Sequence, residues 1–381
     1  MTTRPRTLPE LTAALVAIDS VNPSLVPGGA GERAIADFVA AWLTDAGLDT
    51  RIDDLGDNRC NVVAIARGTG GGKSLMLNAH MDTVGYGGMT DPLTPRTADG
   101  KLRGRGAFDM KASLAAIMLV GEEAARASWR GDLIITAVAD EEFASIGTAR
   151  IAETLKADAA IVTEPTDLEL CVAHKGFAWL EVTTRGVAAH GSLADVGVDA
   201  IAAMGPVLSG IGDLQLALAA RPPHPLLGPP SVHASLVSGG TELSTYPDIC
   251  TVGIERRTIP GEIAADVEDE IGQILLHAAE RDPRLRAEIT MGLVREPFEI
   301  EDDHPFVALV RETASNVLNA PVTLTGGLGW MDSALLAEVG IPTVIYGPHG
   351  DGAHADEEWV DLASAEKARA VYAAVAAAFC A

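Results

Sequence analysis

Residues 133–142 read LIITAVADEE, an uninterrupted apolar run that ends directly in three carboxylates. Such a run, with no polar alternation, is typical of a strand buried on both faces of a parallel sheet. Two similar runs end in the same way: LMLNA (75–79) precedes His80, and AAIVT (159–163) precedes Glu164. We therefore expect a parallel sheet that presents histidine and carboxylate side chains at its carboxyl edge, where open α/β sheets bind ligands.

The pattern around these runs predicts two domains. Helical periodicity over Glu32–Leu48 and Lys111–Ala127 alternates with strand-like runs, which predicts an α/β fold with a mostly parallel sheet and helices on both faces. WLEVTT (179–184) and TVGIERR (251–257) instead alternate apolar and polar residues, as half-buried antiparallel strands do. We expect a catalytic domain made of residues 1–177 and 293–381, with an inserted α+β domain at 178–292.

Composition excludes several classes of function. The 381 residues include 28 Lys and Arg against 53 Asp and Glu, a formal net charge of −25. This charge repels nucleic acids and anionic membrane surfaces and attracts cations. The N-terminal stretch has no signal-peptide core, and we find no apolar run of about 18 residues, so we expect no membrane span. The four cysteines are far apart and form no CxxC pair, which is typical of free thiols in the cytoplasm.

The residues at the predicted sheet edge suit a metal centre. Two histidines and three carboxylates would hold two metal ions if Asp109 bridges them; these are His80, Asp109, Glu142, Glu164 and His354. Asp82 lies two residues after His80, on the same side of an extended chain, where a carboxylate can orient a metal-bound histidine. Glu141 and Glu142 are adjacent, so one can bind metal while the other acts as a base. Two divalent cations would balance three carboxylates and one hydroxide.

Together these stretches resemble the M20 metallopeptidase family, in particular the branch that contains acetylornithine deacetylase and succinyl-diaminopimelate desuccinylase. The resemblance extends over nearly the whole chain and in the same order. It rests on NAHMDTV (78–84), GRGAFDMKAS (104–113), ADEEFASIGT (139–148), VTEPT (162–166), AHKG (173–176), GVAAHGS (186–192), SGGTELSTYPD (238–248), ERRTIPGE (255–262) and GDGAHADEEWV (350–360).

The resemblance implies a role for each residue of the centre. His80 and Glu164 would bind one zinc ion, Glu142 and His354 the other, and Asp109 would bridge them, with cobalt or manganese as substitutes. Asp82 would orient His80, and Glu141 would be the general base and then the general acid. The family also implies a cis peptide bond after Asp109.

The inserted segment resembles the family's lid and dimerisation domain, so we expect a homodimer, although a lid also closes over a monomer. By the same resemblance, His190 stabilises the tetrahedral intermediate and Arg257 binds the substrate carboxylate, with Arg256 the weaker candidate. Ser244 stands where many relatives have an asparagine near the substrate, and a serine is shorter and donates differently.

The function expected from these residues is dizinc-dependent removal of an acyl group from an N-acyl amino acid. Glu164 favours it, because glutamate is common at that position in deacylases. A metallo-exopeptidase, acting as a dipeptidase or carboxypeptidase, would use the same metal site. An amidase or aminohydrolase for a compound that is not an amino acid is a third alternative, which Ser244 keeps open. A binding protein without activity would have lost Glu141 or a metal ligand, and all are present.

Overall fold

The computed structural model describes residues 4–381, which divide into two compact units. The first unit contains residues up to Val172, Ile300–Thr325 and Met331–Ala381, and the second contains Ala173–Glu299 and Gly326–Trp330. The expected inserted domain, residues 178–292, lies within the second unit. That unit also includes a few residues on each side and a short return segment that the sequence pattern did not mark.

The helices are α1 (Leu8–Val16), α2 (Arg33–Asp45), α3 (Ala112–Ala124), α4 (Ile146–Thr154), α5 (Ala200–Ala219), α6 (Ala264–Arg281), α7 (Pro305–Leu318), α8 (Ser333–Glu338) and α9 (Leu362–Phe379). In chain order, the earlier strands are β1 (Asp49–Gly56), β2 (Arg59–Ala66), β3 (Leu75–His80), β4 (Arg96–Ala98), β5 (Lys101–Arg103), β6 (Leu133–Val138), β7 (Ala159–Val162) and β8 (Leu170–His174). The later strands are β9 (Gly176–Arg185), β10 (Ser231–Gly239), β11 (Ile249–Thr258), β12 (Arg286–Arg295), β13 (Phe298–Glu299), β14 (Leu324–Gly327), β15 (Thr343–Ile345), β16 (Gly350–Asp351) and β17 (Trp359–Asp361).

The main sheet is mixed, with a parallel centre. Its order is β1-β2-β6-β3-β7-β15-β8-β13, and β14 pairs with β8. β6, β3, β7 and β15 run parallel to one another, whereas β2 is antiparallel to both β1 and β6, and β8 is antiparallel to β15. The apolar runs that predicted buried strands form this parallel centre, and every residue of β3, β6 and β7 is buried. The antiparallel flanks refine the expected, mostly parallel sheet.

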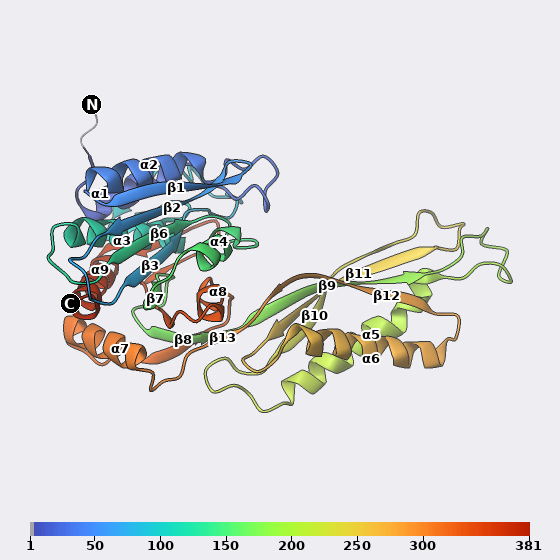
Figure 1. Ribbon diagram of the computed structural model, residues 1–381. Helices are drawn as coiled ribbons and strands as arrows, with labels where there is room; N and C mark the ends of the chain where they lie inside the picture. The colour runs from blue at the N-terminus through green and yellow to red at the C-terminus, as the bar shows by residue number, and fades with distance from the viewer. Residues whose placement is uncertain (1–3) are drawn as a thin grey trace. The chain divides into compact units, whose positions relative to one another are not determined.

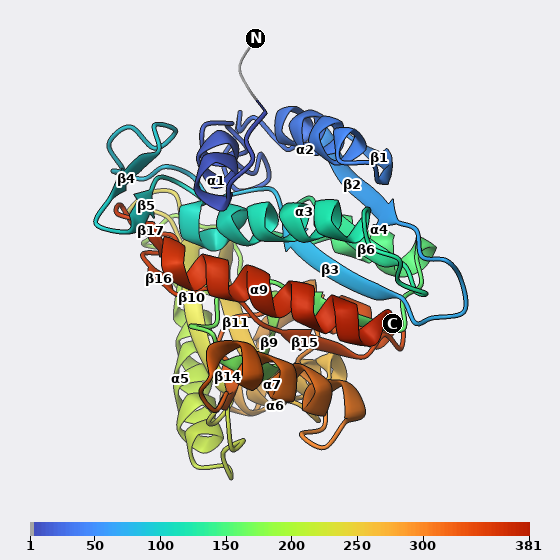
Figure 2. The same ribbon diagram turned by 90° about the vertical axis from the view of Figure 1, so that its left-hand side faces the viewer.

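Helices cover both faces of this sheet. α2 and α3 pack together on β2 and β6, with α1 and α9 against α3, as Figure 2 shows in front of the strands. α4 and α8 pack together, α4 contacting β6 and α8 contacting β7 and β15. Local sequence signals set the helix starts: Thr7 and Glu10 form the reciprocal capping box that begins α1. A smaller sheet of the first unit has the order β16-β17-β5-β4.

The second unit is an antiparallel sheet with two helices (Figure 1). Its strand order is β10-β11-β9-β12, and α5 and α6 pack against the sheet and against each other. The alternating pattern of β11 gives a strictly alternating burial, with Val252, Ile254 and Arg256 on the covered face. The core consists of apolar residues from α5, α6 and the sheet strands, including Leu180, Val207 and Ile271.

The sequence predicted no segment apolar enough to span a membrane, but α5 meets that criterion. By length and composition alone it is apolar enough to cross a membrane, and it is the one helix of the described chain that is. Asp213 and Gln215 interrupt its apolar run, and 22% of its most apolar stretch is buried in the protein. A single helix of this kind is weak evidence for a membrane span.

Candidate metal centre

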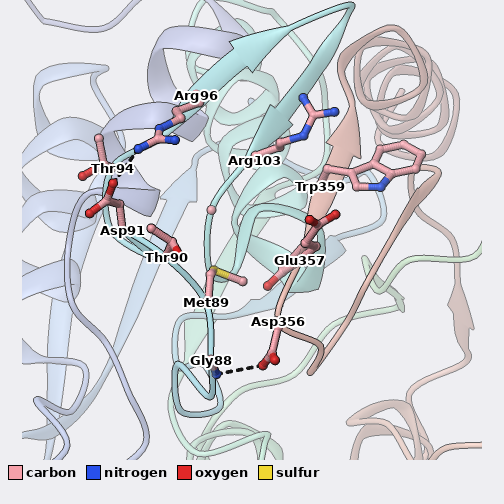
Figure 3. A pocket seen from close by; sticks show the side chains of 12 residues that line it. Gly88, Met89, Thr90, Asp91, Thr94, Arg96, Arg103, Asp356, Glu357 and Trp359 are labelled. Atoms are coloured by element: carbon pink, nitrogen blue, oxygen red, sulfur yellow. Dashed lines mark hydrogen bonds and ion pairs between the residues drawn. The ribbon is translucent and has the colours of Figure 1, made fainter.

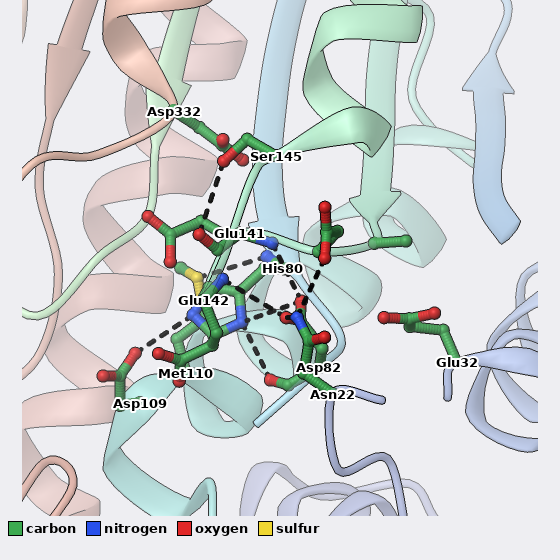
Figure 4. A network of polar contacts seen from close by, with 12 residues as sticks. Asn22, Glu32, His80, Asp82, Asp109, Met110, Glu141, Glu142, Ser145 and Asp332 are labelled. Carbon is green, nitrogen blue, oxygen red and sulfur yellow. Dashed lines mark hydrogen bonds and ion pairs between the residues drawn. The ribbon is translucent and has the colours of Figure 1, made fainter. Parts of the chain in front are cut away.

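The sheet brings the predicted ligands of the first unit to one edge. His80 is the last residue of β3, Glu141 and Glu142 follow β6, and Glu164 follows β7. Because these three strands are parallel, their carboxyl ends meet at the same edge. The loop between β16 and β17 adds His354, and the helical turn that follows β5 adds Asp109. Figure 4 shows several of these side chains directed toward one another.

Two groups of potential metal ligands share one residue. His80, Asp109 and Glu164 form one group and Asp109, Glu142 and His354 the other, with the ligand atoms in each within 4.8 Å of one another. Asp109 directs one oxygen to each group: Oδ1 is 3.0 Å from His80 Nε2, and Oδ2 is 3.4 Å from His354 Nε2. Glu142 Oε2 is 2.9 Å from the same His354 nitrogen, and Glu164 Oε1 is 3.6 Å from His80 Nε2.

This donor set fits a pair of divalent cations. Imidazole and carboxylate ligands suit zinc, and one shared carboxylate is what two neighbouring ions require. Glu141 belongs to neither group, although it lies in the same cluster. The sequence therefore predicted the members of both groups, and the structure places them within ligand distance of one another.

The electrostatics of the site also favour cations. Burial, together with neighbouring carboxylates, raises the pKa values of Glu141 and Glu164 well above their ordinary range. Burial disfavours the charged form of His80, but the carboxylates of Glu164 and Asp109 raise its pKa well above the usual value. Hydrogen bonds to Asp109 and Glu142 raise the pKa of His354 to about 10. Without metal ions, bound protons therefore compensate the negative charge of this cluster. Bound cations would balance the same charge.

Asp82 contacts His80 through its main chain. The carbonyl oxygen of Asp82 is 2.9 Å from His80 Nδ1, while its carboxylate Oδ1 is 3.7 Å away. The carboxylate instead accepts hydrogen bonds from the main-chain N–H groups of Glu141 and Glu142, each at 3.2 Å. Asp82 therefore touches the histidine of one ligand group and the turn that carries both glutamates.

Glu358 is a buried residue that the sequence reasoning did not single out. Its carboxylate accepts hydrogen bonds from Arg105 and from the main-chain N–H groups of Gly106, Phe108 and Asp109. One side chain thus fixes the loop that carries Asp109, and it lies four residues after His354. The peptide bond between Asp109 and Met110 is cis, which confirms the expectation from the family.

The remaining predicted residues lie in the second unit. His190 Nδ1 lies 2.8 Å from the hydroxyl oxygen of Ser192 and 3.2 Å from the main-chain nitrogen of the same residue. Ser244 lies on the adjoining segment, where its carbonyl accepts from the N–H of Gly191 at 2.7 Å. The structure therefore brings His190 and Ser244 together.

The two candidate arginines differ in their surroundings. Arg256 is fully buried and is held by Glu262 and Glu270. Arg257 keeps 31% of its side chain exposed, pairs with Glu255 at 2.9 Å and lies over the Phe177 ring. Arg256 is thus committed to the fold of the second unit, and Arg257 is the arginine that retains access to a ligand.

A surface cavity of about 350 Å³ lies elsewhere in the first unit (Figure 3). Its lining includes Met89, Arg103 and Trp359. Among its charged side chains, Arg96 pairs with Asp91, and the Asp356 carboxylate accepts a hydrogen bond from the main-chain N–H of Gly88. None of the predicted site residues lines it, and we assign it no role in the chemistry.

Comparison with known proteins agrees with the geometry. The chain is 30% identical to the acetylornithine deacetylase of Myxococcus xanthus over 391 residues, with 98% of each chain covered. In structure it resembles a Staphylococcus aureus tripeptidase, with a TM-score of 0.78, 21% identity and 98% of each chain covered. It also resembles a dinuclear metal-binding peptidase of Bacillus subtilis, with a TM-score of 0.73, 18% identity, and 98% and 97% of the two chains covered.

The family itself follows from the sequence. Residues 76–378 match the sequence model of Peptidase family M20/M25/M40, a span that contains every predicted site residue. Members of such a family hydrolyse amide bonds with the help of metal ions. On this evidence from most of its length, the chain belongs to peptidase family M20/M25/M40 and is a hydrolase of amide bonds.

Proposed function

We propose that this protein removes the acyl group from an N-acyl amino acid, using two divalent cations. The observation that carries the proposal is the pair of ligand groups that share Asp109, with Glu141 beside them and outside both. The near full-length similarity to acetylornithine deacetylases, at 27–30% identity, supports the deacylase branch. The substrate class is thus a small N-acylated molecule with a free carboxylate.

The residues that would hold the cations are those of the two groups. His80, Glu164 and one oxygen of Asp109 would hold the first, and Glu142, His354 and the other oxygen of Asp109 the second. Zinc suits these donors, and cobalt or manganese would substitute. Bound there, such ions supply Lewis acidity that polarises an amide carbonyl and lowers the pKa of a water molecule.

Glu141 moves the proton. Burial raises the pKa of Glu141 well above its ordinary value, and a raised pKa suits a carboxylate that first accepts a proton and then returns it. It takes a proton from the attacking water and then gives it to the nitrogen of the leaving amine. Asp82 keeps Glu141 in place through the N–H of that residue.

Two residues of the second unit would act on the substrate. His190 would donate a hydrogen bond from its ring N–H to the oxyanion that develops on the carbonyl, where a fixed donor stabilises the transition state more than the ground state. Arg257 would bind the substrate carboxylate through a bidentate, charge-assisted pair. Ser244, beside His190, would contact the substrate in place of the asparagine of other relatives.

We also infer that the protein is a homodimer that associates through α5 and β10. β10 is an edge strand, and Leu236 and Val237 are 76% and 65% exposed. α5 packs beside β10 and exposes Ile201, Leu208 and Leu216. An open strand edge next to an apolar helix surface is a typical contact for a second copy of the same chain. For the location we propose the cytoplasm, since all four cysteines are buried thiols and not members of disulfides.

The first prediction concerns substrate and base. Zinc-loaded protein is expected to release primary amine from N-acetyl, N-formyl or N-succinyl amino acids, and a chelator is expected to stop the reaction. Glu141→Gln is expected to lower kcat by about 10²–10⁴-fold, because proton transfer is lost, with zinc affinity nearly unchanged.

Glu153→Gln is the matched control, because Glu153 is a 68% exposed glutamate on nearby α4, and it is expected to retain full activity. Amine release from dipeptides alone would assign the protein to exopeptidase action, and release only from amides that are not amino acids would favour an amidase. A Glu141→Gln enzyme with full activity would refute the assigned base.

The second prediction concerns protons and metal. The raised pKa values of His80 and His354 favour their protonated forms in the metal-free protein, and a histidine ligand must be neutral. Zinc binding is therefore expected to release protons, and zinc affinity should fall as the pH is lowered.

Titration calorimetry of zinc in two buffers with different ionisation enthalpies counts these protons. His354→Gln is expected to reduce the number of protons released. His277→Gln, at an exposed residue of α6 in the second unit, should release as many protons as the wild type. Zinc binding that is independent of pH would contradict this assignment of the ligands.

The third prediction concerns the dimer. Sedimentation velocity is expected to show a dimer for the wild type and a monomer for Leu216→Glu, because a carboxylate would be buried without a partner at the interface. Leu276→Glu on α6 is the control, since Leu276 is 59% exposed but lies away from β10, and it should remain dimeric. A monomeric wild type, or a dimeric Leu216→Glu variant, would overturn the proposed interface.

A further inference from the structure

A chain of buried polar side chains lies directly behind the candidate metal centre. It runs from Asp82 through Asn22 to Asp140, and from there through Arg59 to Glu32. We propose that Asn22, backed by the ion pair of Arg59 and Glu32, is a positioning residue that fixes the turn of Glu141 and Glu142 against Asp82. The proposal rests on the metal-dependent hydrolysis proposed above. Figure 4 shows Asn22 beside Asp82 in this network.

Asn22 joins two carboxylates that would otherwise repel each other. Its Nδ2 donates to Asp82 Oδ2 at 2.8 Å and to Asp140 Oδ1 at 3.0 Å. Its Oδ1 accepts from the N–H of Ser24 at 2.9 Å, and the residue is completely buried. A primary amide has two N–H donors, so each carboxylate receives one of them and the side chain has no donor left over. An isosteric aspartate would lack both donors and add a third negative charge.

Asp82 connects Asn22 to the residues proposed to act in catalysis and metal binding. One carboxylate oxygen accepts from the N–H of Glu141 and the other from the N–H of Glu142, while its carbonyl oxygen accepts from His80. The orientation of the Asp82 carboxylate therefore fixes the main-chain positions of Glu141 and Glu142. Asn22 is bonded to the oxygen that also receives Glu142, so loss of Asn22 frees that oxygen to rotate.

Asp140, the first residue of the turn that carries Glu141 and Glu142, is the second carboxylate that Asn22 contacts. Its φ is +71°, in the left-handed region that residues other than glycine seldom adopt. Such a conformation persists only where the surroundings hold it. The main-chain oxygen of Asp140 accepts from the N–H of Ala144, and its side chain accepts from Asn22 and Arg59. Asn22 and Arg59 thus hold the residue that immediately precedes Glu141.

Arg59 supplies the positive charge that the buried carboxylates of Glu32 and Asp140 share. Arg59 donates to both oxygens of Glu32, at 2.7 and 2.8 Å, and to Asp140 Oδ1 at 2.7 Å. The side chains of Glu32, Arg59 and Asp140 are 0%, 6% and 2% exposed. A buried carboxylate next to other carboxylates requires such a partner, and the planar, bidentate guanidinium group suits it better than the ammonium group of lysine.

The test uses metal binding as well as activity. Asn22→Asp and the neutral Asn22→Ser are compared with the wild type in the full-length protein, and far-ultraviolet circular dichroism checks that each variant folds. Zinc affinity is measured by calorimetry, and the visible spectrum of the cobalt-loaded protein reports the geometry of the ligands. Both variants are expected to bind zinc about 10–100-fold more weakly and to shift the cobalt bands, with kcat lowered more than KM is changed.

Arg59 gives an independent arm with a matched control. Arg59→Met is expected to weaken zinc binding, and Arg59→Lys to restore it in part. Arg67→Met removes an arginine that also pairs with two aspartates, Asp49 and Asp132, but is 58% exposed on the surface. It is expected to leave zinc affinity, the cobalt spectrum and kcat as in the wild type.

The outcomes separate this proposal from the proposed function. Folded Asn22→Ser and Arg59→Met variants with the zinc affinity, cobalt spectrum and kcat of the wild type would overturn the positioning role and leave the hydrolase intact. A wild-type protein that binds no zinc and releases no amine would instead refute the proposed function, and the positioning role with it.

Discussion

Repulsion among buried carboxylates is the constraint on which the rest of this structure depends. Asp109, Glu141, Glu142 and Glu164 lie in one cluster with two histidines, and burial opposes the charged form of each carboxylate. Such a cluster is stable only if its negative charge is compensated, by protons on the carboxylates and histidines or by metal ions. The net charge of −25 adds to the attraction for cations. The geometry that gathers the carboxylates is therefore also a geometry that would bind cations.

The fold holds this cluster in place through a few buried residues behind it. The parallel strands β3, β6 and β7 present His80, Glu141, Glu142 and Glu164 at one edge, but strand ends alone do not fix side-chain directions. Glu358 fixes the Asp109 loop through three main-chain N–H groups and Arg105. Asp82 fixes the glutamate turn in the same way. Carboxylates that accept N–H groups thus position the carboxylates proposed to bind metal, as expected of a preorganised metal site.

Much of the fold and of the ligand set was predictable from the sequence, because both depend on local patterns. Apolar runs predicted the parallel strands, and the residues that follow them predicted most members of the two candidate ligand groups. The polar strand β1 was not predicted, since its sequence, DTRIDDLG, has few apolar residues. Asn22, Arg59 and Glu358 were missed because the side chains that they pair with lie 27 to 253 residues away, and a lone polar residue gives no sign that it is buried.

The central claim is that Asp109 joins two cation sites in one chain. Crystals grown with zinc and measured at the zinc absorption edge test it most directly, since anomalous scattering locates each ion independently of the protein atoms. The account predicts two peaks per chain, one beside His80 and Glu164 and the other beside Glu142 and His354, each next to a different oxygen of Asp109. A single peak, or peaks that do not involve Asp109, would contradict it.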